Sequence, residues 1–83
     1  MKARVTVYPR REILDPQGKA IRDALNRVGF PGVEDVRAGK SFEISLGAKD
    51  PEAAGRELRE MCEKLLANTV VEDYAVELLG EKL

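Results

Sequence analysis

The sequence predicts an α+β fold with the element order β-α-β-β-α-β, in which a four-stranded antiparallel sheet carries two helices on one face. Two observations lead to this prediction. Apolar and polar residues alternate near both ends of the chain and again in its middle, as in strands with one buried face. An Asp-Pro pair, which begins a helix well, occurs at residues 15–16 and 50–51, and an amphipathic stripe follows each pair.

The first strand and the first helix lie within residues 3–28. The buried positions of the strand are Ala3, Val5 and Val7. Pro9 ends this strand because proline has no amide hydrogen for the ladder. Asp15 can cap a helix and Pro16 fits its first turn. We therefore predict a helix over 16–28, with Gly29 as the stop that adopts positive φ.

A β-hairpin is predicted next in the chain. Residues 33–36 form its first strand, and a turn lies around Gly39. The second strand has its inward positions at Phe42, Ile44 and Leu46. The Gly39-Lys40-Ser41 run does not match a phosphate-binding loop, because the glycine spacing is wrong and the context is a hairpin, so we expect Lys40 to be solvated.

The second helix begins at Pro51 and ends at Ala67-Asn68, where asparagine tolerates the left-handed conformation that closes a helix. Its apolar stripe consists of Ala54, Leu58, Met61, Cys62, Leu65 and Leu66. On this stripe Cys62 is interpreted as a core thiol and not as a nucleophile. The last strand turns inward Tyr74, Val76 and Leu78 or, with the register shifted by one, Ala75, Glu77 and Leu79.

This order of elements most often folds as a ferredoxin-like sandwich, here as a single domain over residues 1–83. A domain of this size buries only about 60–65% of its unfolded surface, so its core is thin and we expect self-association or a partner. The other face of the sheet has no cover. It is either hydrated or the place where another copy or a partner packs.

Composition excludes several classes of function. The chain has no histidine and one cysteine, so zinc sites, an internal disulfide and histidine-based catalysis are not expected. The net charge of −1 argues against nucleic-acid binding, although residues 1–41 carry +4 and residues 42–83 carry −5. No apolar run approaches the roughly 18 residues of a membrane span. We expect a soluble protein of the cytoplasm, with which a single free thiol agrees.

Two pairs of residues have alternative interpretations. Arg10 and Arg11 precede a helix N-terminus, where they are either solvated or bind an anion or an acidic partner surface. Phe42 and Tyr74 lie on strands, as do the aromatics with which RNA-binding sandwiches stack bases. Four aromatics in total and a nearly neutral charge make core packing the better interpretation.

Four segments in this order resemble the PurS family, the small subunit of phosphoribosylformylglycinamidine synthase in de novo purine biosynthesis. They are Leu14-Asp-Pro-Gln-Gly-Lys-Ala-Ile21, Gly29-Phe30, Val36-Arg-Ala-Gly-Lys40, and Met61-Cys-Glu-Lys-Leu-Leu-Ala-Asn68 continuing through Val71-Glu-Asp-Tyr74. The resemblance spans nearly the whole chain. It is weakest in the first loop, where Arg10-Arg11-Glu12 replaces the lysine and glycine usual in the family, and at Thr69, where proline is common.

The resemblance implies a subunit without catalytic residues and without a cofactor of its own. In the family's enzyme, a glutamine-dependent C–N ligase, the synthetase PurL uses ATP and Mg to convert formylglycinamide ribonucleotide to formylglycinamidine ribonucleotide. The glutaminase PurQ releases the ammonia from glutamine. PurS is implied to hold the two together, so that ammonia reaches its electrophile at high effective concentration and without escaping into water.

A bridging subunit needs surfaces, and the candidates are the open sheet face, the strand edges and a set of polar residues that the core does not require. The polar candidates are Arg10, Arg11, Gln17, Arg37, Lys40, Glu72 and Asp73. We expect a homodimer or a homotetramer. Two other functions stay open: a small ferredoxin-like module that binds an effector, and an acylphosphatase-like enzyme, although the glycine-rich phosphate cradle of the latter is absent from the sequence.

Overall fold

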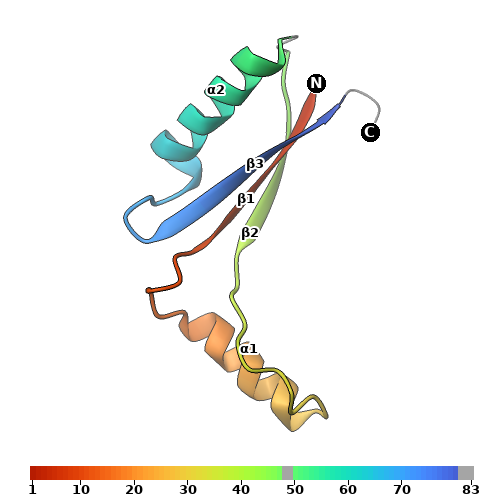
Figure 1. Ribbon diagram of the computed structural model, residues 1–83, viewed down its shortest axis with the longest axis vertical. Helices are drawn as coiled ribbons and strands as arrows, with labels where there is room; N and C mark the ends of the chain where they lie inside the picture. The colour runs from red at the N-terminus through yellow and green to blue at the C-terminus, as the bar shows by residue number, and fades with distance from the viewer. Residues whose placement is uncertain (48–49, 81–83) are drawn as a thin grey trace.

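The computed structural model describes residues 1–47 and 50–80. Within these ranges the chain forms strands β1 (Lys2–Pro9), β2 (Lys40–Ser45) and β3 (Glu72–Gly80), and helices α1 (Pro16–Arg27) and α2 (Pro51–Met61). The π-helix η1 (Cys62–Leu66) continues α2 (Figure 1). The strands form one antiparallel sheet in the order β2-β1-β3, so β1 is hydrogen-bonded on both sides.

One face of the sheet packs against α2 and forms the core. Val5 of β1 lies opposite Phe42 on β2 and Val76 on β3, so these three apolar side chains share a face. The fully buried residues on the two sides of this contact are Ala3, Val5 and Val7 of the sheet and Ala54, Leu58 and Cys62 of the helix. The first of the two registers predicted for the last strand is confirmed, because its inward positions pair with those of β1.

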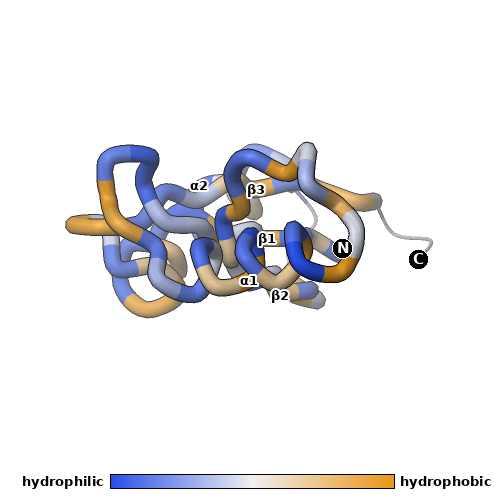
Figure 2. Tube along the Cα trace, turned by 90° about the horizontal axis from the view of Figure 1, so that it is seen from below, coloured by the Kyte–Doolittle hydropathy of each residue, from blue (hydrophilic) through white to orange (hydrophobic). Residues whose placement is uncertain are grey.

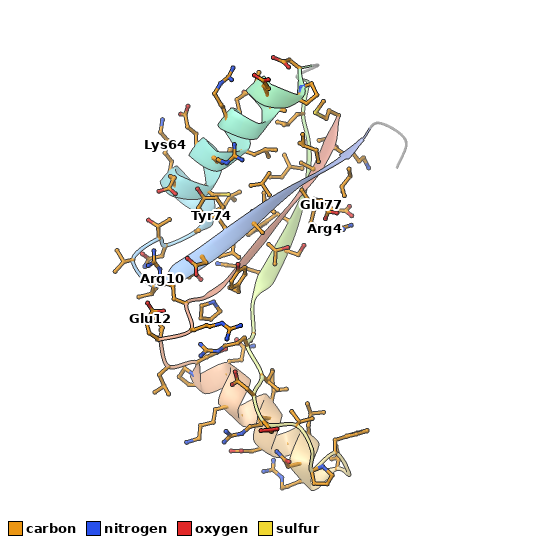
Figure 3. The ribbon with its side chains drawn as sticks, viewed as in Figure 1. Arg4, Arg10, Glu12, Lys64, Tyr74 and Glu77 are labelled. Carbon is orange, nitrogen blue, oxygen red and sulfur yellow. The ribbon has the colours of Figure 1, made fainter. Side chains whose placement is uncertain are left out.

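The opposite face of the sheet is polar. Arg4 of β1 lies between two glutamates of the neighbouring strands, and its guanidinium is 3.5 Å from a carboxylate oxygen of Glu43 and 3.5 Å from one of Glu77 (Figure 3). An apolar partner would remove these three charges from water at a cost that their mutual attraction does not reliably repay. Of the two possibilities left open for this face, the structure favours hydration.

The predicted hairpin is wrong. Residues 33–39 are not in a strand, so the described part of the chain has three strands and not four. Val33 and Val36 are the only large apolar residues of this segment, and polar atoms of the segment bond outside the sheet. The side chain of Asn26 donates to the Val33 carbonyl at 3.3 Å, and the Ala38 amide donates to Asp15 at 2.8 Å. The segment therefore runs along α1 instead of along the sheet.

The prediction that both helices cover one face is also wrong. An α+β fold with two helices and an antiparallel sheet is confirmed, but α1 lies beyond the end of the sheet, as Figure 1 shows. We call residues 16–34 the arm. The radius of gyration is 15.9 Å, whereas a compact domain of this length has about 12 Å. The chain is correspondingly flat and long, with extents of 48 × 30 × 14 Å.

The two ends of α1 follow the sequence signals closely. Asp15 has extended backbone angles and caps the helix, and Pro16 occupies the first turn. Gly29 has a φ of 114°, and the Phe30 amide donates to the Leu25 carbonyl at 2.9 Å, which is the Schellman closure expected at a glycine stop. The helix ends one residue before the predicted Val28.

The end of the second helix differs from the prediction. The Ala67 amide donates to the Cys62 carbonyl at 3.0 Å, five residues back, so the last turn is a π-helix. This wider turn leaves Leu65 83% exposed, although the stripe placed it in the core. Asn68 does not adopt positive φ. Its side-chain oxygen accepts from the Val70 amide at 3.3 Å instead, as in an Asx turn.

The Asp15 carboxylate joins the start of α1 to the segment that leaves the arm. One oxygen accepts from the Gly18 amide at 3.1 Å and the other from the Ala38 amide at 2.8 Å. The hydrogen bond from Ala38, then that from Gly18 and the charge of Arg37, lower the pKa of Asp15 from its ordinary 3.8. Ionised Asp15 therefore stabilises the folded state.

Replacing Leu58 with alanine is expected to destabilise the fold by about 2–5 kcal/mol, because the fully buried side chain leaves a cavity against β1. Urea unfolding followed by circular dichroism measures the loss. Val70→Ala is the control, since Val70 is 79% exposed and its truncation should cost less than about 0.5 kcal/mol. Equal midpoints for the two variants would contradict this account of the core.

Stability should also fall in acid through Asp15. Its folded pKa lies below 3.8, so its contribution is present above the unfolded value and is lost as the pH falls through the folded value. In Asp15→Asn, which does not titrate, the unfolding free energy should decline less between about pH 5 and about pH 2.

Glu34→Gln is the control for that comparison, because it removes a carboxylate of the arm that makes neither of the two hydrogen bonds of Asp15. It should keep the acid dependence of the natural chain. An Asp15→Asn variant with the same acid dependence as the natural chain would show that Asp15 is not responsible.

Candidate functional site

The arm joins the sheet through two chain segments, residues 10–15 and 35–39, which we call the waist (Figure 1). All seven residues predicted to contact partners lie in the waist or within two residues of an element end beside it. Two of them, Arg10 and Arg11, are in its first segment, and Arg37 is in its second. Gln17 lies in the first turn of α1, and the remaining three are the first residues of β2 and β3.

The structure brings five of these residues together in two hollows. A hollow of about 350 Å³ is lined by Gln17, Lys40 and Glu72, together with Val7, Ala38 and Gly39. Another, of about 440 Å³, is lined by Arg11 and Arg37, together with Tyr8, Pro9 and Asp35. Five of the seven positions thus line hollows at the waist, and residues 17 and 72 share one of them although they are far apart in the sequence. That this region binds a partner stays a prediction.

Arg37 holds the first segment of the waist in place. One guanidinium nitrogen donates to the carbonyls of Arg10 and Ile13 at 3.0 and 2.8 Å, and the other terminal nitrogen donates to the carbonyl of Arg11 at 2.6 Å. Its Nε lies 3.6 Å from the Asp35 carboxylate. The planar, permanently charged guanidinium carries its donors in a fixed fork, which suits these three carbonyl acceptors. Arg37 is therefore a structural residue of the waist before it is a contact residue.

Arg10 anchors the loop that precedes β3. Its guanidinium donates to the Thr69 carbonyl at 2.7 Å, and its amide donates to the Val71 carbonyl at 3.0 Å. The Nε of Arg10 is 3.7 Å from the Asp73 carboxylate, too long for a hydrogen bond (Figure 3). Both side chains are partly exposed, so the pair contributes at most about 1 kcal/mol.

Glu72 is also engaged within the chain. Its carboxylate accepts from the Asn68 amide at 2.7 Å and so closes the turn that leads into β3. The Glu72 amide in turn donates to the Asn68 carbonyl at 2.8 Å. Of the seven predicted residues, three thus have structural bonds of their own, which the sequence did not indicate.

Sequence reasoning missed Gly18. It is the one buried residue of α1, and a Cβ at this position would collide with the backbone of Val36 and would lie 2.6 Å from an Asp15 carboxylate oxygen. Glycine near the start of a helix costs roughly 1 kcal/mol against alanine. That cost is the signal that points to a close backbone approach.

A separate apolar groove of about 520 Å³ lies between the end of α2 and β2. Its floor and walls are Ile44, Met61, Leu65 and Leu66. Charged residues line its rim, namely Glu57, Glu60 and Lys64, the last two of which form an ion pair at 3.1 Å. In a ferredoxin-like sandwich a second helix would cover this side of the sheet, and no second helix does so among the described residues.

Two side chains with acid–base or nucleophilic chemistry, Cys62 and Tyr74, are buried or hydrogen-bonded. The thiol of Cys62 is fully buried, as predicted, and burial and the charge of Glu63 raise its pKa. Tyr74 donates to the Glu63 carboxylate at 2.7 Å, and this hydrogen bond is the main reason for its raised pKa (Figure 3).

Among residues 1–47 and 50–80, no helix has the length and apolar character needed to cross a membrane.

Comparison with known proteins gives consistent results. The family model described as PurS, phosphoribosylformylglycinamidine (FGAM) synthase, matches residues 2–80. PurS of Mycobacterium leprae is 49% identical over 90% of this chain and 91% of its own. The structure of Bacillus subtilis PurS is 44% identical, with a TM-score of 0.78 over 92% of this chain and 94% of that one.

A third relative comes from a complex. A chain in the structure of PurLQS from Thermotoga maritima is 36% identical, with a TM-score of 0.84 over 93% of this chain and 95% of that one. The resemblance predicted from the four sequence segments is confirmed. The chain therefore belongs to the PurS family, the PurS subunits of phosphoribosylformylglycinamidine synthase.

Proposed function

We propose that this chain is a non-catalytic bridge between the synthetase PurL and the glutaminase PurQ. The observation that carries the proposal is the distribution of chemistry and surface. Cys62 and Tyr74 are buried or hydrogen-bonded, while the chain exposes 6034 Å², against about 4900 Å² for a compact monomer of its mass. The relative within the Thermotoga maritima PurLQS structure supports the assignment of the partners.

A bridge contributes to catalysis by proximity. Ammonia released from glutamine by PurQ is delivered to the amide of formylglycinamide ribonucleotide on PurL, at a high effective concentration and away from water. ATP, Mg and glutamine are bound by the larger subunits and not by this chain. A biosynthetic complex of this kind belongs in the cytoplasm, and a reduced, buried Cys62 is in keeping with that compartment.

Self-association is part of the same proposal, and the arm carries it. Several large apolar residues of the arm and its flanks are exposed: Leu14 at 79%, Val28 at 69%, Phe30 at 57% and Ile21 at 39%. Because only α2 covers the sheet, the groove between α2 and β2 is open. Because α1 packs on no sheet within the chain, its apolar side is open as well. The arm of a second copy fits the groove between α2 and β2, and a two-fold axis would make the exchange reciprocal.

Charge favours the same pairing. Helix α1 has three basic residues and one acidic residue, while the groove rim has Glu57, Glu60 and Lys64. Helix α1 therefore carries a net charge of +2 and the groove lining one of −1, so the two surfaces have opposite charge. Figure 2 shows hydrophobic and hydrophilic stretches alternating along the chain, and an interface needs both, for an apolar centre and a polar rim.

Reconstitution tests the bridging role. Adding this chain to purified PurL and PurQ should raise glutamine-dependent formation of formylglycinamidine ribonucleotide severalfold and should produce a faster-sedimenting complex. The rate supported by ammonium chloride is the control, since free ammonia bypasses the bridge and should be used equally well without the chain. No change in either glutamine-dependent rate or sedimentation would contradict the proposal.

Leu65→Asp tests the groove. Losing the burial of one leucine costs about 1.5–3 kcal/mol, and two symmetric grooves are affected, so self-association should weaken by at least about 100-fold. Sedimentation velocity at several protein concentrations measures this effect. The fold should tolerate the change, because the side chain is 83% exposed within one chain.

Val70→Asp is the matched control, since Val70 is 79% exposed and does not line the groove. It should leave self-association unchanged. Equal weakening by both variants, or by neither, would place the contact elsewhere.

A further inference from the structure

The arm is linked to the sheet through the waist. In Figure 1, α1 lies clear of the sheet, and residues 10–15 and 35–39 are its covalent links to β1 and β2. Two flexible links would let the arm swing, and each orientation would be populated in proportion to its free energy. The waist is instead cross-linked by specific bonds.

Three residues supply these cross-links. Asp15 of the first segment accepts from the Ala38 amide of the second at 2.8 Å. Arg37 of the second segment donates to three carbonyls of the first, at 2.6–3.0 Å. Gly18 lets the backbone at Val36 approach the first turn of α1, where any Cβ would collide with it. Each segment of the waist thus supplies one charged side chain that bonds to the backbone of the other segment.

Helix capping alone does not explain this arrangement. A cap needs one carboxylate oxygen, which the Gly18 amide occupies at 3.1 Å, and it does not need glycine at its third position. The second oxygen of Asp15, the fork of Arg37 and the missing side chain of Gly18 all act between the segments. Their shared effect is on the geometry of the arm.

We propose that Asp15, Gly18 and Arg37 form a latch that fixes the orientation of the arm relative to the sheet, so that the arm is already aligned to enter the groove of a second copy. The three are positioning residues for assembly. The proposal rests on the self-association proposed above. Alignment before binding matters because the apparent affinity falls with the fraction of chains that are competent to bind.

Gly18→Ala tests the latch, because alanine favours the helix while its Cβ opens the waist. If only about one tenth of the arms stay aligned, and both copies must present one, self-association should weaken about 100-fold. Gly55→Ala in α2 is the matched control, since its Cβ would meet only the flexible end of Arg59, at 3.5 Å. It should leave self-association unchanged.

Residual dipolar couplings measure the orientation of α1 relative to the sheet directly. They are measured for the natural chain and each variant, and again with Leu65→Asp added to each, so that a second copy does not hold the arm. With Gly18 in place, one alignment tensor should fit the couplings of α1 and of the sheet together. In Gly18→Ala the couplings of α1 should shrink severalfold. Arg37→Lys, which keeps the charge but loses the fork, should shrink them less. It also serves as the second variant if Gly18→Ala does not fold.

Undiminished α1 couplings in Gly18→Ala and Arg37→Lys would overturn the latch. Diminished couplings with unchanged self-association would show that assembly does not need an aligned arm, and would overturn the inference while leaving the proposed function intact. A natural chain that stays monomeric would instead remove the proposed self-association, and the couplings would still decide whether the latch orients the arm.

Discussion

The hydrogen bonds across the waist determine where α1 lies relative to the sheet, and therefore which apolar surfaces of the chain stay exposed. Asp15 and Arg37 tie the segment that enters α1 to the segment that leaves it, at distances of 2.6–3.0 Å between Arg37 or Ala38 and their acceptors. The helix is thereby held beyond the end of the sheet instead of folding back onto it. Its own apolar residues stay exposed, and so does the groove that a second helix would have covered.

The sheet has two faces of different character. Val5 and Val7 are buried beneath α2, and Arg4 on the reverse side lies between two glutamates. A single helix covers only part of the apolar face, which leaves the groove beside Met61 and Leu65. The charged reverse face disfavours an apolar partner, whereas the groove and the arm both offer exposed apolar residues for assembly.

Local features of this fold were predictable from the sequence because short-range rules govern them. The Asp15 cap, the Gly29 closure and the alternation in β1 all follow from neighbouring residues. The docking of α1 was not predictable, since an amphipathic stripe shows that a helix has an apolar side but not which chain covers it. Residues 33–36 were misassigned because two valines resemble a strand, whereas bonds to distant side chains decide their path.

The candidate site was predictable as a group but not in its details. Its residues lie at the ends of elements, and the ends of β1, β2 and β3 meet at the waist. The bonds of Arg37 and the close approach at Gly18 depend on segments about 20 residues apart, beyond the range of any local pattern. The exposure of Leu65 depends on the π-helical turn at residues 62–66, and no residue pattern in that helix predicts this turn.

This chain leaves a groove and an arm that a second copy of itself would complete. Native mass spectrometry of the unmodified chain at micromolar concentration tests this self-association most directly. The account predicts a particle of at least twice the chain mass of 9.2 kDa. A particle of 9.2 kDa alone, at concentrations where the chain supports assembly with its larger partners, would contradict it.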